Sequence, residues 1–159
     1  MAKKFRNAAS FGKRIEFWII GEMMKEGLDV YVPLVDDMGI DAIVRQSEGK
    51  FIEVQIKARS KDVKNPRDAA LFSAIKHEHR ENYWFVFYSE GMDTKWIMSS
   101  EEFIEESRQN DKGKNKGKRS IWLNGRRKNK ETGEYELYTL PQFEKYVEED
   151  FRRLKDDTK

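Results

Sequence analysis

A regular alternation of apolar and polar side chains marks the stretch from 50 to 58. The apolar positions are Ile52, Val54, Ile56 and Ala58, and the positions between them are Phe51, Glu53, Gln55 and Lys57. Successive side chains of a β-strand point to opposite faces, so this period of two predicts a strand with one buried and one polar face. An acid, an amide and an amine therefore share the polar face.

The stretch from 39 to 46, Gly-Ile-Asp-Ala-Ile-Val-Arg-Gln, predicts the antiparallel partner of this strand. A three-residue loop over 47–49 would place Asp41 opposite Gln55, with their Cβ atoms about 5 Å apart. A two-residue loop at 48–49 would shift the register by one and put the acid among the core residues. We favour the three-residue loop because it keeps the carboxylate out of the core.

The polar face of this hairpin offers the groups that a metal-dependent hydrolase needs. Carboxylate and amide oxygens from Asp41, Glu53 and Gln55 suit a hard cation such as Mg²⁺. The Lys57 amine can stabilise a charged phosphate or orient an attacking water. The alternative is a salt-bridged face of an ordinary solvated hairpin, and the pattern by itself leaves both interpretations open.

A helix is predicted from Ser10, as its N-cap, to about Glu26, with Gly27 as the C-terminal stop. Its broad apolar surface consists of Ile15, Trp18, Ile19, Ile20 and Met23. Glu16 lies on the flank of that surface. On spacing alone, this carboxylate is an exposed acid or a local partner of Lys13.

The remaining pattern indicates an α/β chain. We expect strands at 28–33, 83–88, 94–98, 120–123 and 134–139, and helices at 65–79, at 99–109 and from Leu140 onward. Asn65 as cap and Pro66 at the first position favour the helix over 65–79. The nearly continuous apolar strand at 83–88 suggests a parallel neighbour reached by a right-handed crossover. The predicted order is αβββαββα, followed by a C-terminal hairpin and helix around a mixed central sheet.

Composition narrows the class of protein. The chain has 159 residues, of which 38% are charged and 13% aromatic. These values predict a single domain that spans residues 1–159, with a core large enough to be stable without disulfides or structural metals. Cysteine is absent, which excludes thiol catalysis and cysteine-ligated zinc and is compatible with a cytoplasmic setting. No stretch approaches the ~18 apolar residues of a membrane span, so we expect no membrane partner. His77 and His79 do not share a helix face, and we interpret both as surface polar residues.

Positive charge is concentrated between Lys112 and Lys130, where nine Lys or Arg residues occur without one acid. The part at about 111–119 has almost nothing to bury, so we expect a mobile loop. Such a segment is suited to phosphate contacts, although a solvated hairpin loop is an equally open interpretation. The candidate nucleic-acid-binding residues are Lys112, Lys114, Lys116, Lys118, Arg119, Arg126, Arg127 and Lys128.

The order of Glu16, Asp41, Glu53/Gln55 and Lys57 resembles the PD-(D/E)xK nuclease superfamily, which includes restriction endonucleases, Holliday-junction resolvases and Mrr-type enzymes. The resemblance covers about 11–89 and rests on a helix Glu, a Gly-Ile-Asp strand start and a Gln-x-Lys strand. Gly-Ile-Asp stands where Pro-Asp is usual. Gln55 replaces the usual acid two residues before the lysine, as it does in the Mrr-type branch.

The resemblance implies a restriction-endonuclease-like fold and a Mg²⁺- or Mn²⁺-dependent endonuclease acting on DNA. In that arrangement Asp41 binds the metal, Glu53 or Gln55 completes the site, Glu16 binds through water, and Lys57 acts on the nucleophile or the phosphate. Several members of the superfamily need a dimer to place two sites on two strands, so a homodimer is among the expected partners.

Two other functions remain open at this point. A neutral amide binds Mg²⁺ more weakly than a carboxylate, so the chain could be a nuclease-fold nucleic-acid-binding protein with weak or no catalysis. It could also be a protein-interaction domain whose polar hairpin face is merely solvated. Dependence on a divalent cation separates the enzyme from the binder, and affinity for nucleic acid at low salt separates both from the interaction domain.

Overall fold

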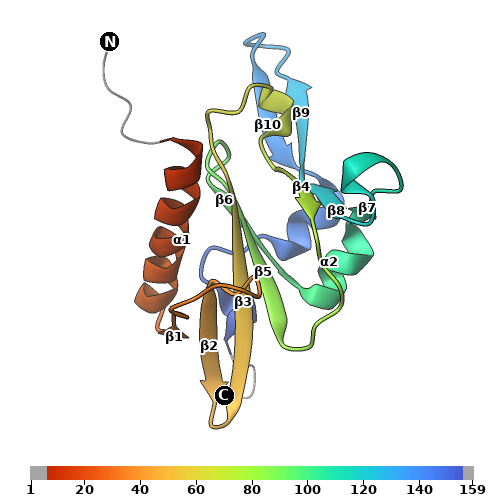
Figure 1. Cartoon of the computed structure of the whole chain (residues 1–159). Helices are drawn as coiled ribbons and strands as arrows, with labels where there is room; N and C mark the ends of the chain where they lie inside the picture. The colour runs from red at the N-terminus through yellow and green to blue at the C-terminus, as the bar shows by residue number, and fades with distance from the viewer. Residues whose placement is uncertain (1–6, 156–159) are drawn as a thin grey trace.

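The computed structural model describes residues 7–155 of the chain. Its centre is a five-stranded sheet in the order β1-β2-β3-β5-β6 (Figure 1). The strands are β1 (Asp29–Tyr31), β2 (Ala42–Ser47), β3 (Lys50–Arg59), β5 (Tyr83–Ser89) and β6 (Thr94–Ser99). β3 and β5 run parallel, whereas the other neighbouring strands are antiparallel. The sheet is therefore mixed, and the expected α/β class is confirmed.

One face of this sheet packs against helix α1 (Ala8–Lys25) (Figure 1). Asn7, rather than Ser10, caps the helix: the Asn7 side chain accepts from the backbone of Ser10, and the Ser10 hydroxyl accepts in return. No helix in the described part of the chain is long and apolar enough to cross a membrane. The core between α1 and the sheet includes Ile19, Ile20, Met23, Ala42, Val44, Ile52, Val54 and Ile56.

The opposite face carries a second layer. This layer contains helix α2 (Ser100–Glu106) and a three-stranded sheet of β4 (Leu71–Ile75), β8 (Arg119–Trp122) and β7 (Arg108–Gln109). The hairpin of β9 (Asn124–Lys128) and β10 (Tyr135–Thr139) extends from it, as the sequence predicts. The core on this side is rich in aromatic rings, among them Phe72, Phe85, Phe87, Trp96, Phe103, Phe143 and Tyr146.

The helix predicted over 65–79 is wrong. Asn65 does cap a turn that starts at Pro66, but the turn is a single 3₁₀ helix, η1 (Pro66–Asp68), and β4 follows it. In β4, Phe72 pairs with Ile121 of β8 and packs into the aromatic core. The capping signal governs only the first turn, and pairing with a strand about 50 residues away overrides the local preference beyond it. The parallel pairing of β3 with β5 is nevertheless formed as expected.

The C-terminal helix predicted from Leu140 onward is also wrong. Two 3₁₀ turns replace it, η3 (Pro141–Tyr146) and η4 (Arg152–Leu154). Phe143 and Tyr146 enter the aromatic core, whereas Phe151 and Leu154 enter the core under α1. A straight helix presents its apolar stripe to one side only, so residues that serve two cores on opposite faces of a sheet cannot share one helix.

The turn between β2 and β3 differs from the expected one, yet the register does not. Ser47 pairs with Lys50, which leaves a two-residue turn, and Gln46 bulges out of the ladder. The extra residue in β2 compensates for the shorter turn, so Ala42 lies opposite Val54, as a three-residue loop would place it. The Gln46 side chain donates to the carbonyl of Leu154 at 3.0 Å, which anchors the bulge.

Candidate functional site

Asp41 is buried at the start of β2, with 7% of its surface exposed. Its Oδ2 atom accepts a hydrogen bond from the backbone N–H of Ile56 at 2.7 Å. Ile56 is the residue between Gln55 and Lys57 on β3. The hydrogen bond therefore holds the carboxylate beside the Gln-x-Lys segment.

Two further carboxylates act on Asp41. Burial raises the pKa of Asp41 to about 6, the hydrogen bond from Ile56 opposes this shift, and the nearby charges of Glu16 and Asp36 add to it. The Glu16 side chain is 15% exposed and forms an ion pair with Lys13 at 3.1 Å. Acids from α1, from the loop before β2 and from the start of β2 therefore act on one another electrostatically, which concentrates negative charge here.

Gln55 is held from the neighbouring strand. The Tyr83 hydroxyl lies 3.0 Å from Gln55 Oε1 and also bonds to the carbonyl of Gly39. Gly39 has a φ of 68°, and a Cβ atom there would lie 3.1 Å from Gln55 Nε2 and 3.2 Å from the Tyr83 hydroxyl. Glycine thus allows the loop before Asp41 to approach the amide closely. Burial raises the pKa of Tyr83 well above its ordinary value, which keeps the hydroxyl protonated.

Glu53, a predicted metal ligand, is engaged by a cation of this chain. Its carboxylate forms an ion pair with Arg80 Nη2 at 3.2 Å, while Arg80 Nη1 donates to the carbonyl of Met38 at 2.7 Å. The same guanidinium lies over the Tyr83 ring, 4.3 Å from its centroid. Arg80 therefore ties β3 to the loop that leads to Asp41, which favours Gln55 over Glu53 as the hairpin residue that completes a metal site.

Lys57 lies two residues beyond Gln55 on β3 and so shares its face of the strand. It is half-buried, and it forms no ion pair with any residue in the range 7–155.

The predicted nucleic-acid-binding residues fall into two groups. The Arg119 guanidinium forms hydrogen bonds within the fold, to the carbonyl of Ile104 at 3.2 Å and to the Ser107 hydroxyl at 3.4 Å. Lys118 is only partly exposed, and the turn before it is closed by a backbone bond from Asn110 to its carbonyl at 2.8 Å. The exposed members are Lys112, Lys114, Lys116, Arg127 and Lys128, while Arg126 is partly exposed. The mobility of the loop at 111–119 stays a prediction.

The donor set suits a hard divalent cation held by few protein ligands. Across residues 7–155, no three acidic, histidine or cysteine side chains are grouped as a closed metal cage. Mg²⁺ commonly takes only one or two carboxylates and keeps several waters. Asp41 and Glu16, with the amide oxygen of Gln55, are hard donors of this kind, and a cation would relieve the charge repulsion that Glu16 and Asp36 impose on Asp41.

Two residues that act on the site, Arg80 and Tyr83, are not predicted by the sequence pattern, whereas the sequence offers Asp36 either as an acid that assists a metal or as a turn former. Asp36 has the sequence context of a turn former, and it does bond to the backbone N–H of Ile40 at 2.8 Å, but its charge also acts on Asp41. A buried tyrosine such as Tyr83 needs a hydrogen-bond partner for its hydroxyl, so the sequence does indicate that a partner exists. The identity of that partner depends on the register between β3 and β5, which the sequence does not specify.

His77 is not the surface residue that its sequence context predicts. It is half-buried beside the Tyr83 ring, at 5.3 Å between centroids, and its Nε2 lies 2.6 Å from the Ser100 hydroxyl. Burial lowers the pKa of His77 to about 4. The neutral ring therefore belongs to the packing behind Tyr83.

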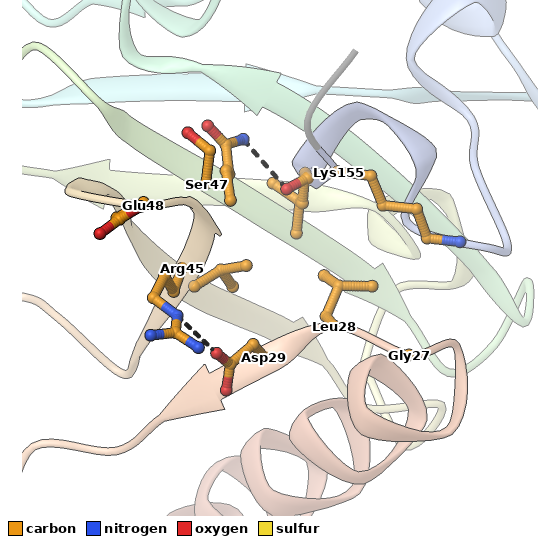
Figure 2. Close-up of a pocket in the computed structure, with 10 residues that line it drawn as sticks. Gly27, Leu28, Asp29, Arg45, Ser47, Glu48 and Lys155 are labelled. Carbon is orange, nitrogen blue, oxygen red and sulfur yellow. Dashed lines mark hydrogen bonds and ion pairs between the residues drawn. The ribbon is translucent and has the colours of Figure 1, made fainter. Parts of the chain in front are cut away.

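A cavity of about 610 Å³ lies at the other end of β2 from Asp41. Figure 2 shows Arg45 and Asp29, paired at 2.8 Å, on one side of it, with Glu48 near the turn and Lys155 across from them. Both signs of charge line this cavity, and none of the predicted site residues does. It is therefore separate from the candidate site.

Comparisons with known proteins place the fold. No family model and no curated protein matches the chain. Among solved structures, the fold is similar to that of a bacterial homing endonuclease, I-Ssp6803I, with a TM-score of 0.60 and 20% sequence identity. The similarity covers 93% of this chain and 91% of that one, so it extends over nearly the whole of both folds.

Proposed function

We propose that this chain is a metal-dependent endonuclease that hydrolyses phosphodiester bonds in DNA, with a site of the PD-(D/E)xK type. The main support for this proposal is the position of Asp41. Its buried carboxylate accepts a hydrogen bond from the backbone N–H of Ile56, the residue between Gln55 and Lys57. The similarity in fold to a homing endonuclease supports it. The order of the site residues along the chain supports it independently.

Asp41 and Gln55, with Glu16 on the α1 side, would hold Mg²⁺ or Mn²⁺. When bound, the cation would supply a Lewis acid that lowers the pKa of the attacking water and neutralises charge on the phosphate. Lys57 binds the phosphate oxygen that gains negative charge as water adds to phosphorus. The attacking water gives up one proton to the solvent as its oxygen bonds to phosphorus, the P–O ester bond breaks, and the leaving oxygen takes up one proton from the solvent.

One backbone group and one side chain of the fold set the geometry of this chemistry. The Ile56 N–H orients Asp41, and the Tyr83 hydroxyl orients Gln55. The exposed lysines from Lys112 to Lys116 and the arginines of β9 contact phosphates away from the cleaved bond. Their contribution falls steeply with salt, because each phosphate contact releases a counterion.

The test is cleavage of labelled linear, nicked, single-stranded and branched DNA in Mg²⁺ or Mn²⁺. We expect cleavage by the wild type and none by Asp41→Ala or Lys57→Ala. Asp37→Ala and Lys50→Ala are the matched controls, because both residues are exposed, the first in the same loop and the second on the same strand. Cleavage that survives Lys57→Ala at the wild-type rate would contradict the proposed site.

A binding protein with the same fold is the second candidate, and the Arg80–Glu53 pair favours it. With Glu53 engaged and Gln55 neutral, Asp41 is the one carboxylate of the hairpin face left for a metal among the described residues. A binder keeps its affinity for DNA in EDTA and cleaves nothing in either metal. Binding without cleavage, unchanged in Asp41→Ala and Lys57→Ala, would select this function.

A further inference from the structure

A smaller pocket of about 280 Å³ lies where β8, the β9–β10 hairpin and η1 meet. In Figure 1 this hairpin extends at the end of the molecule opposite the β2–β3 turn. The pocket is lined by Arg67, Trp122, Asn124, Gly125, Arg126 and Tyr135. Two aromatic rings and two arginines, from separate segments of the chain, thus converge on one concave surface without a carboxylate.

Trp122 is held rigidly although it is 46% exposed. Its indole N–H donates to the carbonyl of Arg67 at 3.0 Å and lies 3.1 Å from Asn124 Oδ1. Asn124 is itself buried and accepts from the backbone of Ala70 at 2.9 Å. Since the protein already satisfies the indole N–H, the exposed part of Trp122 offers a ligand its apolar ring surface.

Tyr135 provides a second exposed ring, with 56% of its surface accessible. The Arg126 guanidinium lies over this ring, 3.7 Å from the centroid, which is a stacked cation–π arrangement. Gly125 leaves room for the Tyr138 ring of the opposite strand to lie over it, because a Cβ atom there would lie 2.5 Å from that ring. Hydrogen bonds thus hold Trp122 and Asn124 in the pocket wall, and the charge of the two arginines suits an anionic ligand.

We propose that this pocket binds one unpaired nucleobase of a DNA strand, by stacking on Trp122 and on the Arg126–Tyr135 pair, with Arg67 contacting an adjoining phosphate. The inference rests on the proposed function in one respect, that the ligand is DNA. Aromatic rings stack on a base only when its π-face is uncovered, which excludes a base inside an intact duplex. The pocket thus favours DNA with a single-stranded, flapped or branched region.

The experiment measures binding in EDTA by fluorescence anisotropy, so that no cleavage is required. The probes are a labelled single-stranded oligonucleotide, an abasic oligomer of the same length and charge, and a blunt duplex. We expect Trp122→Ala to weaken binding of the single strand by about 5- to 100-fold and binding of the duplex by less than about twofold. Trp122→Phe, which keeps a ring, should retain most of the affinity. Phe51→Ala removes an exposed ring on β3 and is the matched control.

Equal losses for the single strand, the abasic oligomer and the duplex would overturn the inference, because only phosphate contacts would then be involved. If Trp122→Ala fails to fold by circular dichroism, Tyr135→Ala in the exposed hairpin provides the same comparison. Cleavage by the wild type with unchanged single-strand affinity in these variants would reject the base pocket and leave the endonuclease intact. Loss of base-dependent binding in these variants, with a wild type that never cleaves, would support the base pocket and reject the endonuclease.

Discussion

The Tyr83 hydroxyl lies 3.0 Å from Gln55 Oε1 and reaches the carbonyl of Gly39 at the same time. In the parallel register of β3 and β5, Tyr83 is opposite Glu53 and Phe85 is opposite Gln55, so the tyrosine reaches diagonally across the strands. One side chain of β5 therefore couples the loop before Asp41 to the Gln-x-Lys segment.

Tyr83→Phe should lower the rate of metal-dependent DNA cleavage by about 5- to 30-fold, which corresponds to about 1–2 kcal/mol for the lost orientation of Gln55. The ring and its packing remain, so the free energy of unfolding should fall by only about 1 kcal/mol. Tyr88→Phe is the matched control, because the Tyr88 hydroxyl makes a similar bond, 3.0 Å to Asp93, away from the site. Equal rates for the two variants would show that Tyr83 has no positioning role.

Asp41→Asn should change how stability depends on pH. The pKa of Asp41 is raised to about 6, first by burial, whereas an unfolded aspartate titrates near 3.9. Between these values the folded state binds more protons than the unfolded state, so the Asp41 contribution to stability falls as pH rises from about 4 to about 6. The variant lacks this titration, and urea unfolding of both proteins across this range, without divalent cations, measures the difference.

The wild type should therefore lose stability relative to Asp41→Asn as the pH rises through this window. Asp37→Asn, in the same loop and exposed, should follow the wild type. Addition of Mg²⁺ at about pH 7 should stabilise the wild type more than the variant, since a ligand that binds the folded state raises the free energy of unfolding. A stability difference that is the same at every pH would rule out the titration of Asp41 as its source.

Glu53→Gln and Glu16→Gln should separate a structural acid from a metal-binding one. Because Glu53 is already paired with Arg80, its replacement should leave the Mg²⁺ concentration for half-maximal cleavage within about twofold and cost at most about 1 kcal/mol of stability. Glu16→Gln should raise that concentration on the order of tenfold. Metal titrations of cleavage measure both. If Glu53→Gln shifts the titration as far as Glu16→Gln does, Glu53 binds the metal despite Arg80.

Two glycine substitutions should act in opposite directions on stability. Gly21 lies within α1, and no atom lies within 4 Å of the position that an added Cβ would take, so Gly21→Ala should stabilise the fold by about 0.5–1 kcal/mol. At Gly125 the added methyl group would meet the Tyr138 ring at 2.5 Å, so Gly125→Ala should destabilise by about 1–3 kcal/mol. Urea denaturation measures both changes. If Gly21→Ala destabilises the protein, the space around Gly21 is smaller than the open 4 Å found in the structure.

Local rules sufficed for several elements. Alternation along β3, the capping box that joins Ser99 to Glu102 and the β9–β10 hairpin all follow from residues close in sequence, and all three are formed. The same rules failed after Asn65, because its cap is satisfied within one turn whereas Phe72 finds its partner in β8. Local chemistry starts an element, but distant pairing decides where it ends.

By itself the sequence determined which side chains share the face of β3, because the period of a strand is two and Glu53, Gln55 and Lys57 are two apart. Only the tertiary structure decided what each of them meets. Arg80 reaches Glu53 and Tyr83 reaches Gln55 because β5 packs parallel to β3, and α1 sets the charge of Glu16 near Asp41. These contacts join residues far apart in the chain, and their energies depend on burial and distance, which periodicity along a sequence does not encode.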